Sequence, residues 1–165
     1  MRNQCVKVVY LTDELARKTA EMLNSFAMAR PAEGVVYWFG IESATSAVVT
    51  SLMVPDAETG AGYLRTSVQA NAEVVSRIAG TRLVYIGQAH SHPGVNVEHS
   101  ETDDVDTFAC FDGVISVVVP WFGRYGFHLI DCGVYRHIGG QFRQIRNVDQ
   151  HIQILPSFID LRDGR

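Results

Sequence analysis

The chain has 165 residues, enough for one ordinary domain with a hydrophobic core and short for two, so we expect a single domain over residues 1–165. Fourteen Lys and Arg against 18 Asp and Glu give a formal net charge of -4, with no run of five or six like charges. This balance argues against nucleic acid or a membrane surface as a partner. The apolar stretch at 6–11 is interrupted by Lys7 and too short for a signal sequence or membrane span, so a soluble, cytoplasmic protein is expected.

The cysteines indicate a reducing environment. Cys5, Cys110 and Cys132 are odd in number, lie far apart in the sequence and include no C-x-x-C pair. We therefore interpret them as reduced thiols, not as a disulfide framework or a metal cluster.

The N-terminal third of the sequence predicts a strand, a helix and a hairpin. A strand is expected at 6–11, and Thr12, followed by two acidic residues, is a suitable N-cap for a helix that ends before Pro31. Two apolar, β-branched and aromatic runs at 34–41 and 47–54, joined by a short polar segment, predict a β-hairpin.

The remaining elements follow in alternation. The Gly-, Pro- and acid-rich stretch at 55–62 is expected to be a loop, and apolar residues at helical spacing predict a second helix from Val68 to Ile78. A core strand at 82–89 leads directly into His90, and a short helix is expected from Ser100 to about Phe111. Further strand candidates lie at 114–120, 125–130, 134–138 and 142–145.

This order of elements predicts an α+β fold, with a central mixed sheet flanked by two or three helices. No repeat or change in composition marks a domain boundary. The tail at 148–165 contains apolar residues around Phe158, so part of it is expected to dock while its last three residues fray.

The most informative motif is His90-x-His92-x7-Ser100-x2-Asp103. Two histidines at i and i+2 point to the same side of an extended backbone, so both imidazoles can reach one ion. A carboxylate on the element that returns after the Pro/Gly loop can supply a third ligand. Three protein ligands with one position open to water are the pattern of a catalytic zinc site.

Other roles are open for several of these side chains. Two histidines at a strand end can simply hydrogen-bond a carbonyl and face water, and Ser100 can act as a helix N-cap in a capping box with Asp103. Asp104 and Asp106 are the alternatives to Asp103, although the spacing favours Asp103. Of the other histidines, His99 is expected to be a loop residue near the substrate, whereas three are expected to be ordinary surface or core groups: His128, His137 and His151.

A hydrolytic zinc site also needs a base that takes a proton from water and passes it to the leaving amine. The candidates by position in the chain are Glu33, Glu42, Glu58 and Glu98. Glu33 is attractive because it stands at the entry of a buried strand, where burying a carboxylate is otherwise costly. Its alternative role is that of a loop acid after Pro31.

These residues resemble the hallmark of the JAMM metalloproteases, the catalytic branch of the MPN/JAB domain family. The hallmark is an upstream glutamate followed by H-S/T-H-P-x6-S-x2-D, and every position of it is filled here. The segment at 31–40 resembles the family's P-x-E-x-C-G-x-L-x-G, except that Gly34, Val35 and Val36 replace a small residue, cysteine and glycine. The resemblance covers residues 6–145 and implies the cytidine-deaminase-like JAB/MPN fold.

The resemblance also implies roles for the site residues. One Zn2+ per chain would be bound by His90, His92 and Asp103. Glu33 would be the general acid/base that takes the proton of the attacking water and protonates the leaving amine, and Ser100 would stabilise the oxyanion of the tetrahedral intermediate.

The implied reaction is hydrolysis of a peptide or isopeptide bond after the C-terminal glycine of a ubiquitin-like protein, in precursor processing or in deconjugation. Compact versions of the family are typical of bacteria and archaea. Several of these accompany ubiquitin-like, activating-enzyme-like and conjugating-enzyme-like proteins, including in phage defence, so such proteins are the expected partners.

The sequence leaves three alternatives to this function. A peptidase for small peptides or for a sulfur-carrier protein would have the same fold and site. A non-catalytic MPN scaffold generally lacks one or more of the ligands, and the complete set here disfavours it. A zinc deaminase is disfavoured because its combined H-x-E and P-C-x-x-C signature is absent.

Overall fold

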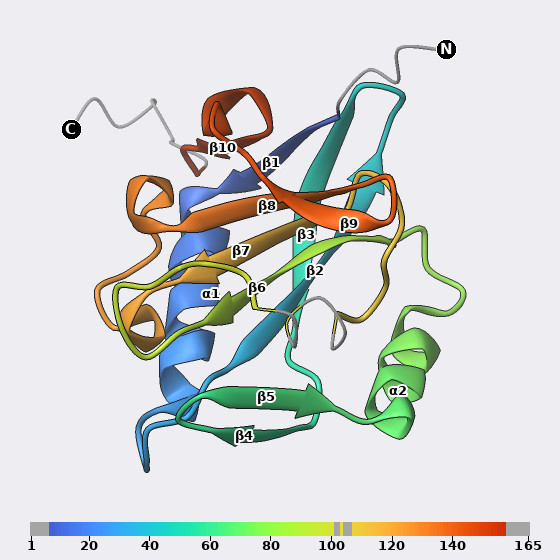
Figure 1. The fold of residues 1–165 in the computed structure, drawn as a ribbon. Helices are drawn as coiled ribbons and strands as arrows, with labels where there is room; N and C mark the ends of the chain where they lie inside the picture. Colours follow the sequence, from blue (N-terminus) through green and yellow to red (C-terminus); the bar gives the residue numbers. More distant parts are fainter. Residues whose placement is uncertain (1–6, 101–102, 104–106, 158–165) are drawn as a thin grey trace, which may run out of the picture.

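The computed structural model describes residues 7–100, 103 and 107–157. Its centre is an eight-stranded mixed sheet with the strand order β10-β1-β3-β2-β6-β7-β8-β9, shown in Figure 1. These strands are β1 (Val8–Thr12), β2 (Val35–Glu42), β3 (Ser46–Met53), β6 (Val84–Ser91), β7 (Ile115–Val119), β8 (Gly133–Ile138), β9 (Gln141–Gln144) and β10 (Ile152–Leu155). A separate two-stranded sheet pairs β4 (Ala57–Gly60) with β5 (Tyr63–Thr66).

Helix α1 (Asp13–Phe26) begins as the sequence predicts. The backbone N–H of Leu15 donates to Thr12 Oγ1 at 3.2 Å, and Asp13 and Glu14 in the first turn favour the positive end of the helix dipole. The helix buries Ala16, Thr19, Ala20 and Leu23 against one face of the sheet. There the Trp38 indole N–H donates to Thr19 Oγ1 at 3.3 Å, so even the polar atoms of this interface are hydrogen-bonded.

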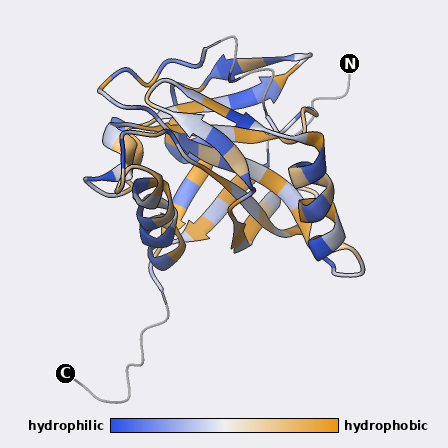
Figure 2. Ribbon diagram, turned by 90° about the horizontal axis from the view of Figure 1, so that it is seen from below, coloured by the Kyte–Doolittle hydropathy of each residue, from blue (hydrophilic) through white to orange (hydrophobic). Residues whose placement is uncertain are grey.

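The opposite face of the sheet holds a second apolar cluster. Strand β2 is buried from Val35 to Gly40, with Val36 and Trp38 toward α1 and Val35, Tyr37 and Phe39 toward the other side. Helix α2 (Val68–Ile78) contributes Val74 to this second cluster. In Figure 2 the central strands are largely hydrophobic, while the helices carry hydrophilic residues over part of their surface. A strand covered on both faces reads as a continuous apolar run, as β2 does.

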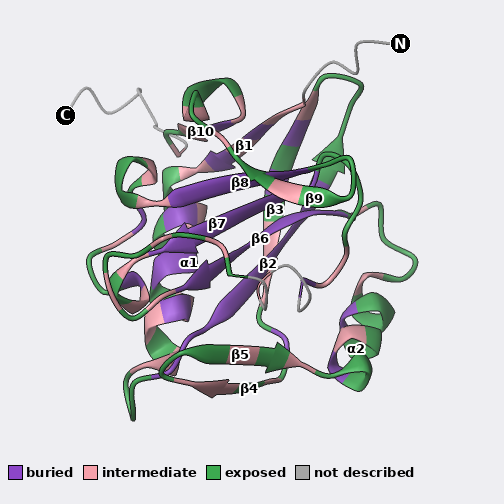
Figure 3. Cartoon of the chain, in the orientation of Figure 1, coloured by how far each residue is buried: buried purple, intermediate pink, exposed green. Residues whose placement is uncertain are grey.

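Strand β6 lies in the middle of this arrangement. It pairs antiparallel with β2, where Val35 is opposite His90, and parallel with β7, where His90 is opposite Val118. Seven of its eight residues are buried, and Figure 3 shows it within the most deeply buried part of the sheet. The C-terminal end of β6 is therefore a rigid support for the residues that follow it.

The α+β class with a mixed central sheet is confirmed, as are the predicted hairpin of β2 and β3 and the helix at 68–78. Two α-helices are present in the described part of the chain. No helix there is long and apolar enough to cross a membrane. The helix expected from Ser100 falls largely outside the described residues, and its expected end at 107–111 is not helical.

Two expectations for the remaining segments were wrong, and the expected docking of part of the tail is confirmed. The loop expected at 55–62 contains β4 and the turn into β5, a short hairpin concealed by its Gly- and acid-rich composition. The strand expected at 125–130 is a turn, because Gly126 adopts a φ of 94° and Leu129–Asp131 forms a 3-10 turn, η2. The tail docks as β10, which extends the sheet by pairing parallel with β1.

Candidate metal centre

His90 and His92 lie at the C-terminal end of β6. His90 is within the strand, and the backbone N–H of His92 donates to the Val119 carbonyl at 2.9 Å, which keeps the chain extended one residue further. The two imidazoles consequently lie on the same side, with ring centroids 5.1 Å apart. The structure thus brings the two predicted ligands together by strand geometry alone.

Asp103 lies against both histidines. Its Oδ1 is 3.5 Å from His90 Nε2 and its Oδ2 is 3.6 Å from His92 Nε2, and one ligand atom from each residue falls within 4.8 Å of the others. Asp103 is held by Ser100 through two reciprocal bonds: Ser100 N–H donates to Asp103 Oδ2 at 2.6 Å, and Asp103 N–H donates to Ser100 Oγ at 3.2 Å. This is a capping-box arrangement that also orients the carboxylate.

The geometry fits a zinc ion. Tetrahedral zinc with ligand bonds near 2.1 Å separates its ligand atoms by about 3.4 Å, close to the two nitrogen–oxygen distances observed. His90 is 3% exposed, and neither of its ring nitrogens has a hydrogen-bond partner among the described residues. Buried polar atoms without partners are rare and call for an explanation, and a cation on Nε2 would provide one.

The tautomer of His92 is suited to a ligand. Its Nδ1 lies 2.9 Å from the Asn96 carbonyl oxygen, which can only accept, so Nδ1 carries the proton. In the neutral ring this leaves the lone pair on Nε2, the atom that faces Asp103. A backbone carbonyl commonly orients a metal-binding histidine in this way.

The loop between the ligands is held by Tyr135 of β8, a residue that the sequence motifs do not reveal. The Tyr135 hydroxyl donates to the Val97 carbonyl at 3.0 Å and accepts the His99 N–H at 3.1 Å. The loop passes so close to β8 that a Cβ on Gly133 would lie 2.1 Å from the Val97 oxygen. Only the tertiary fold identifies this tyrosine, because a single aromatic residue on a strand carries no motif.

His99 occupies a different place from the one expected. Its Nε2 is 3.0 Å from Ser116 Oγ, and its ring packs against Tyr135 and Phe142 at centroid distances of 4.7 and 4.9 Å. It also lies edge-on to His90 at 5.4 Å. His99 is therefore a packing residue beneath the loop and beside a predicted ligand.

Glu33 is placed next to this group by the register of β2 and β6. Ser91 N–H donates to the Gly34 carbonyl at 3.0 Å, and Gly34 N–H donates to Ser91 Oγ at 3.0 Å, so Glu33 comes beside His92 across the pair. Its backbone N–H donates to the Gly60 carbonyl at 2.8 Å, and its side chain is buried, with 7% exposure. Glu33 is thus a buried acid that lies next to His92 in the register of the two strands.

Burial and neighbouring charges tune these groups. Burial, assisted by the negative charge of Asp103 and opposed by His92, raises the pKa of Glu33 above its usual value. The pKa of Asp103 lies far below its usual range: burial would raise it, but the close approach of both imidazoles and the hydrogen bond from the Ser100 N–H lower it by more. Burial alone would lower the pKa of His92, yet its bonds to Asp103 and Asn96 raise it.

The other candidates lie apart from this group. Glu42 pairs with Lys7 at 2.6 Å, while Glu58 and Glu98 are exposed. His128 Nε2 lies 3.1 Å from the Tyr125 carbonyl oxygen, and His137 Nδ1 lies 3.3 Å from Asp112 Oδ1. Among the described residues, the only group of side chains that could hold a metal is His90, His92 and Asp103. Asp104 and Asp106 lie outside the described residues.

The described cysteines take no part in the site. Cys110 and Cys132 form no disulfide within the described part of the chain, and Cys5 lies outside it. Burial, with a contribution from the Asp131 charge, raises the pKa of Cys132 to about 12, so this thiol stays protonated at neutral pH.

Comparison with known proteins supports both the fold and the chemistry. No protein-family model matches the sequence. A curated protein of Sinorhizobium fredii named "Probable metalloprotease" is 32% identical over 112 residues, 63% of this chain. The aligned region spans 66% of that relative's length.

Three solved structures share the fold. A JAB1/MPN domain protein from Archaeoglobus fulgidus matches with a TM-score of 0.51 and 15% identity, covering 88% of this chain and 98% of that one. A protein from Desulfitobacterium hafniense matches with a TM-score of 0.69 and 12% identity over 91% and 94% of the two chains. A third, from Salinibacter ruber, has a TM-score of 0.55 and 16% identity over 89% and 90%.

Fold and site together define the class: this chain has the JAB/MPN fold, with two histidines and an aspartate converging at the end of a central strand. With its metalloprotease-named relative, this combination is consistent with a JAMM/MPN metalloprotease.

Proposed function

We propose that this chain is a JAMM-type zinc peptidase. The observation that carries the proposal is the convergence of His90, His92 and Asp103, with the buried Glu33 carboxylate beside them. Two imidazoles and one carboxylate form a donor set typical of catalytic zinc, which keeps one position for water or substrate. A protein that bound zinc only for stability would more often use four protein ligands.

Each residue has a definite task in this proposal. Zinc, when bound, would supply Lewis acidity, lowering the pKa of a water molecule to about 7 and polarising the scissile carbonyl. Glu33 takes the proton of the attacking water and delivers it to the leaving amine. Its raised pKa suits this task, because a base whose pKa approaches the working pH both accepts and returns a proton efficiently.

Ser100 has two roles in the proposal. Its oxygen accepts the Asp103 N–H, its hydroxyl donates to no described residue, and the side chain is exposed. A hydroxyl can accept one bond and donate another, so Ser100 both caps the Asp103 segment and donates to the oxyanion of the tetrahedral intermediate.

The proposed substrate is the extended C-terminal tail of a ubiquitin-like protein, cut after its terminal glycine in a precursor or a conjugate. Support comes from the hairpin of β4 and β5, which is tied to the site because Gly60 accepts the Glu33 N–H. A two-stranded sheet has two edges with unpaired backbone groups, and an extended peptide can add to such an edge. Activating-enzyme-like and conjugating-enzyme-like proteins, in a cytoplasmic bacterial pathway linked to phage defence, are the proposed partners.

The test combines metal analysis with cleavage. Purified protein should contain close to one zinc per chain and should cut a ubiquitin-like fusion after its terminal glycine. His90→Ala should lose both zinc and activity, whereas the matched His151→Ala, at a half-buried histidine just before β10 and apart from the ligands, should lose neither. Asp103→Ala should lose zinc where Asp104→Ala retains it.

The outcomes separate the alternatives. Absence of zinc in the wild-type protein, with ligand variants unchanged in stability, would contradict the metal site. Cleavage of short peptides but not of any ubiquitin-like fusion would identify a small-peptide enzyme. Zinc binding without hydrolysis of either substrate would indicate a scaffold.

A further inference from the structure

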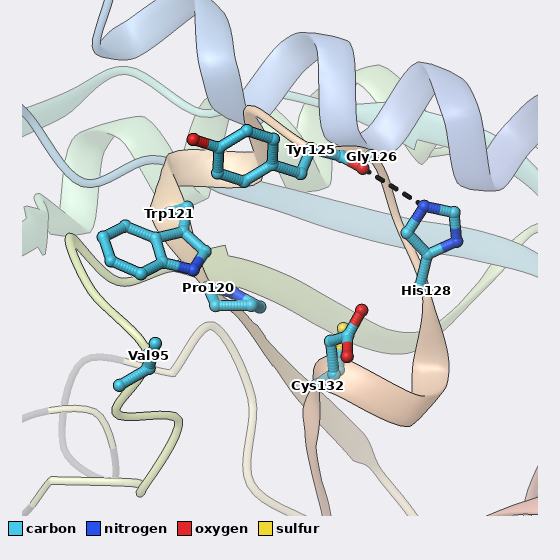
Figure 4. Close-up of a pocket in the computed structure, with 8 residues that line it drawn as sticks. Val95, Pro120, Trp121, Tyr125, Gly126, His128 and Cys132 are labelled. Atoms are coloured by element: carbon cyan, nitrogen blue, oxygen red, sulfur yellow. Dashed lines mark hydrogen bonds between the residues drawn. The ribbon is translucent and has the colours of Figure 1, made fainter.

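A groove of about 410 Å3 lies between Val95, in the loop after β6, and the segment that follows β7. Figure 4 shows the side chains that line it. It lies beyond the C-terminal ends of the parallel strands β6 and β7, where the loops that follow the two strands meet. The carboxyl ends of neighbouring parallel strands are a common place for ligands. Its walls include Val95, Pro120, Trp121, Tyr125, Asp131 and Cys132.

The aromatic wall is joined directly to the metal-ligand loop. Trp121 N–H donates to the Gly94 carbonyl at 3.2 Å, and Phe122 N–H donates to the His92 carbonyl at 2.8 Å. The backbone of His92 is thus bonded at both its N–H and its carbonyl to the segment from Val119 to Phe122. A peptide bound at the metal centre would therefore have this groove next to it.

The backbone that presents the wall is strained. Trp121 and Phe122 adopt φ values of 55° and 56°, left-handed conformations that are unfavourable for residues other than glycine. Gly123 continues the turn with a φ of 72°, where an added Cβ would lie 2.9 Å from the Ala20 carbonyl oxygen. Strain of this kind persists where the surrounding structure enforces it, and it concentrates at ligand sites.

The exposed groups of the groove match a basic side chain. Trp121 is 43% exposed and Tyr125 66% exposed, with the two rings at 81° to one another and 6.3 Å between centroids. The Asp131 carboxylate is exposed and makes no ion pair with any described residue. Aromatic faces attract a cation and the methylene groups that carry it, and a nearby carboxylate balances the positive charge. Tyr125 already shows this preference, since the Arg124 guanidinium lies 6.0 Å from its ring centroid.

We propose that this groove binds a lysine or arginine side chain of the peptide substrate, close to the bond that is cut. The inference rests on the proposed peptidase function and adds a specificity to it. The volume is near the lower end of the range of about 300–1,000 Å3 for small-ligand sites, so one or two side chains fit and a folded partner does not.

Tryptophan fluorescence tests the binding without any need for turnover. The chain has two tryptophans, of which Trp38 is fully buried and Trp121 is partly exposed, so a ligand in the groove changes the emission of Trp121 alone. The probes are short extended peptides that are identical except for lysine, norleucine or glutamate at one position. The lysine peptide should bind most tightly, and Trp121→Phe should abolish the emission change while Trp38 reports an intact core.

A pair of matched variants tests the charge. Asp131→Asn should weaken binding of the lysine peptide about two- to fivefold and leave the norleucine peptide unchanged. Asp149→Asn is the control, because Asp149 is likewise exposed, lies in a 3-10 turn (Val148–Gln150, η3) and is remote from the groove lining. Equal binding of all three peptides, or equal effects of both variants, would overturn the groove assignment.

The same peptides separate this inference from the function on which it rests. Preferential binding of the lysine peptide without hydrolysis of any peptide would contradict the peptidase function and leave the groove in place. Hydrolysis of all three peptides at equal kcat/KM, unchanged in Asp131→Asn, would keep the peptidase and remove the groove as its specificity site.

Discussion

At the scale of single residues, the proposed function assigns metal binding and proton transfer to different side chains. The nitrogen and oxygen atoms of His90, His92 and Asp103 face one another, while Glu33 lies in the segment just before β2. Metal content and turnover should therefore respond to different substitutions.

Glu33→Gln should leave zinc content and thermal stability close to wild type and lower kcat at least 100-fold, because an amide cannot accept the proton. The loss corresponds to the roughly 100- to 10,000-fold contribution typical of general acid–base catalysis. Zinc analysis, thermal melting and a cleavage assay on the same preparation provide the measurement. An active Glu33→Gln enzyme would remove this residue as the base.

Zinc affinity should fall as the pH is lowered, and the fall should begin at a higher pH than for an unperturbed imidazole. A metal-bound imidazole must be neutral, and the interaction with Asp103 raises the pKa of His92, so protons compete with zinc sooner. Each imidazole that must lose a proton costs about tenfold in affinity per pH unit below its pKa. Asp103 stays ionised through this range because its pKa is lowered. Competition titrations from pH 5.5 to 8 that gave a constant affinity would contradict the ligand assignment.

At the scale of elements, strand register and one clamped loop assemble the centre. The pairing of Val35 with His90 brings Glu33 beside the candidate ligands, although Gly34 and Ser91 are 57 positions apart in the sequence. The loop that returns to Asp103 depends on the Tyr135 hydroxyl, which bonds its backbone twice.

Tyr135→Phe should therefore weaken zinc binding about tenfold while the fold is retained, as expected when a group that orients metal ligands is removed. The ring and its packing on His99 are kept, and only the two hydrogen bonds to the loop are lost. Tyr63→Phe is the matched control, because Tyr63 is 56% exposed on β5. Zinc titration of the two variants side by side gives the comparison, and an equal affinity in both would show that the clamp is unimportant.

At the scale of the whole molecule, one buried arginine holds distant edges of the sheet together. Arg136 of β8 is 3% exposed and donates to the carbonyls of Gly113 at 3.0 Å, Lys7 at 2.9 Å and His151 at 3.2 Å. These carbonyls lie just before the strands β7, β1 and β10, so one guanidinium connects three strands of the curled sheet. Burial lowers the pKa of Arg136 without removing its charge at neutral pH.

Arg136→Leu should destabilise the protein by about 2–4 kcal/mol, because the three hydrogen bonds of a buried guanidinium to backbone carbonyls would be lost. Arg143→Leu on β9, where the side chain is exposed, should change the stability by less than about 0.5 kcal/mol. Urea unfolding of the zinc-free proteins measures both effects. Similar midpoints for the two variants would show that Arg136 does not close the sheet.

The sequence by itself determined the local features of this protein. The cap at Thr12, the hairpin of β2 and β3 and the i, i+2 geometry of the two histidines each depend on neighbouring residues, which spacing and residue type describe. The interpretation of 125–130 failed because its alternating pattern did not reveal the left-handed backbone of Gly126.

Only the tertiary structure decided the rest, because those features depend on contacts between distant segments. The pairing of β10 with β1, the Tyr135 clamp and the groove beside Trp121 arise where chain segments far apart in sequence meet. No local sequence pattern predicts these contacts, because the hydrogen-bond partner of each backbone or hydroxyl group depends on how the whole sheet folds. The candidate ligands could be selected from the sequence because chemistry constrains their residue types and spacing, whereas the surroundings that orient them could not be predicted.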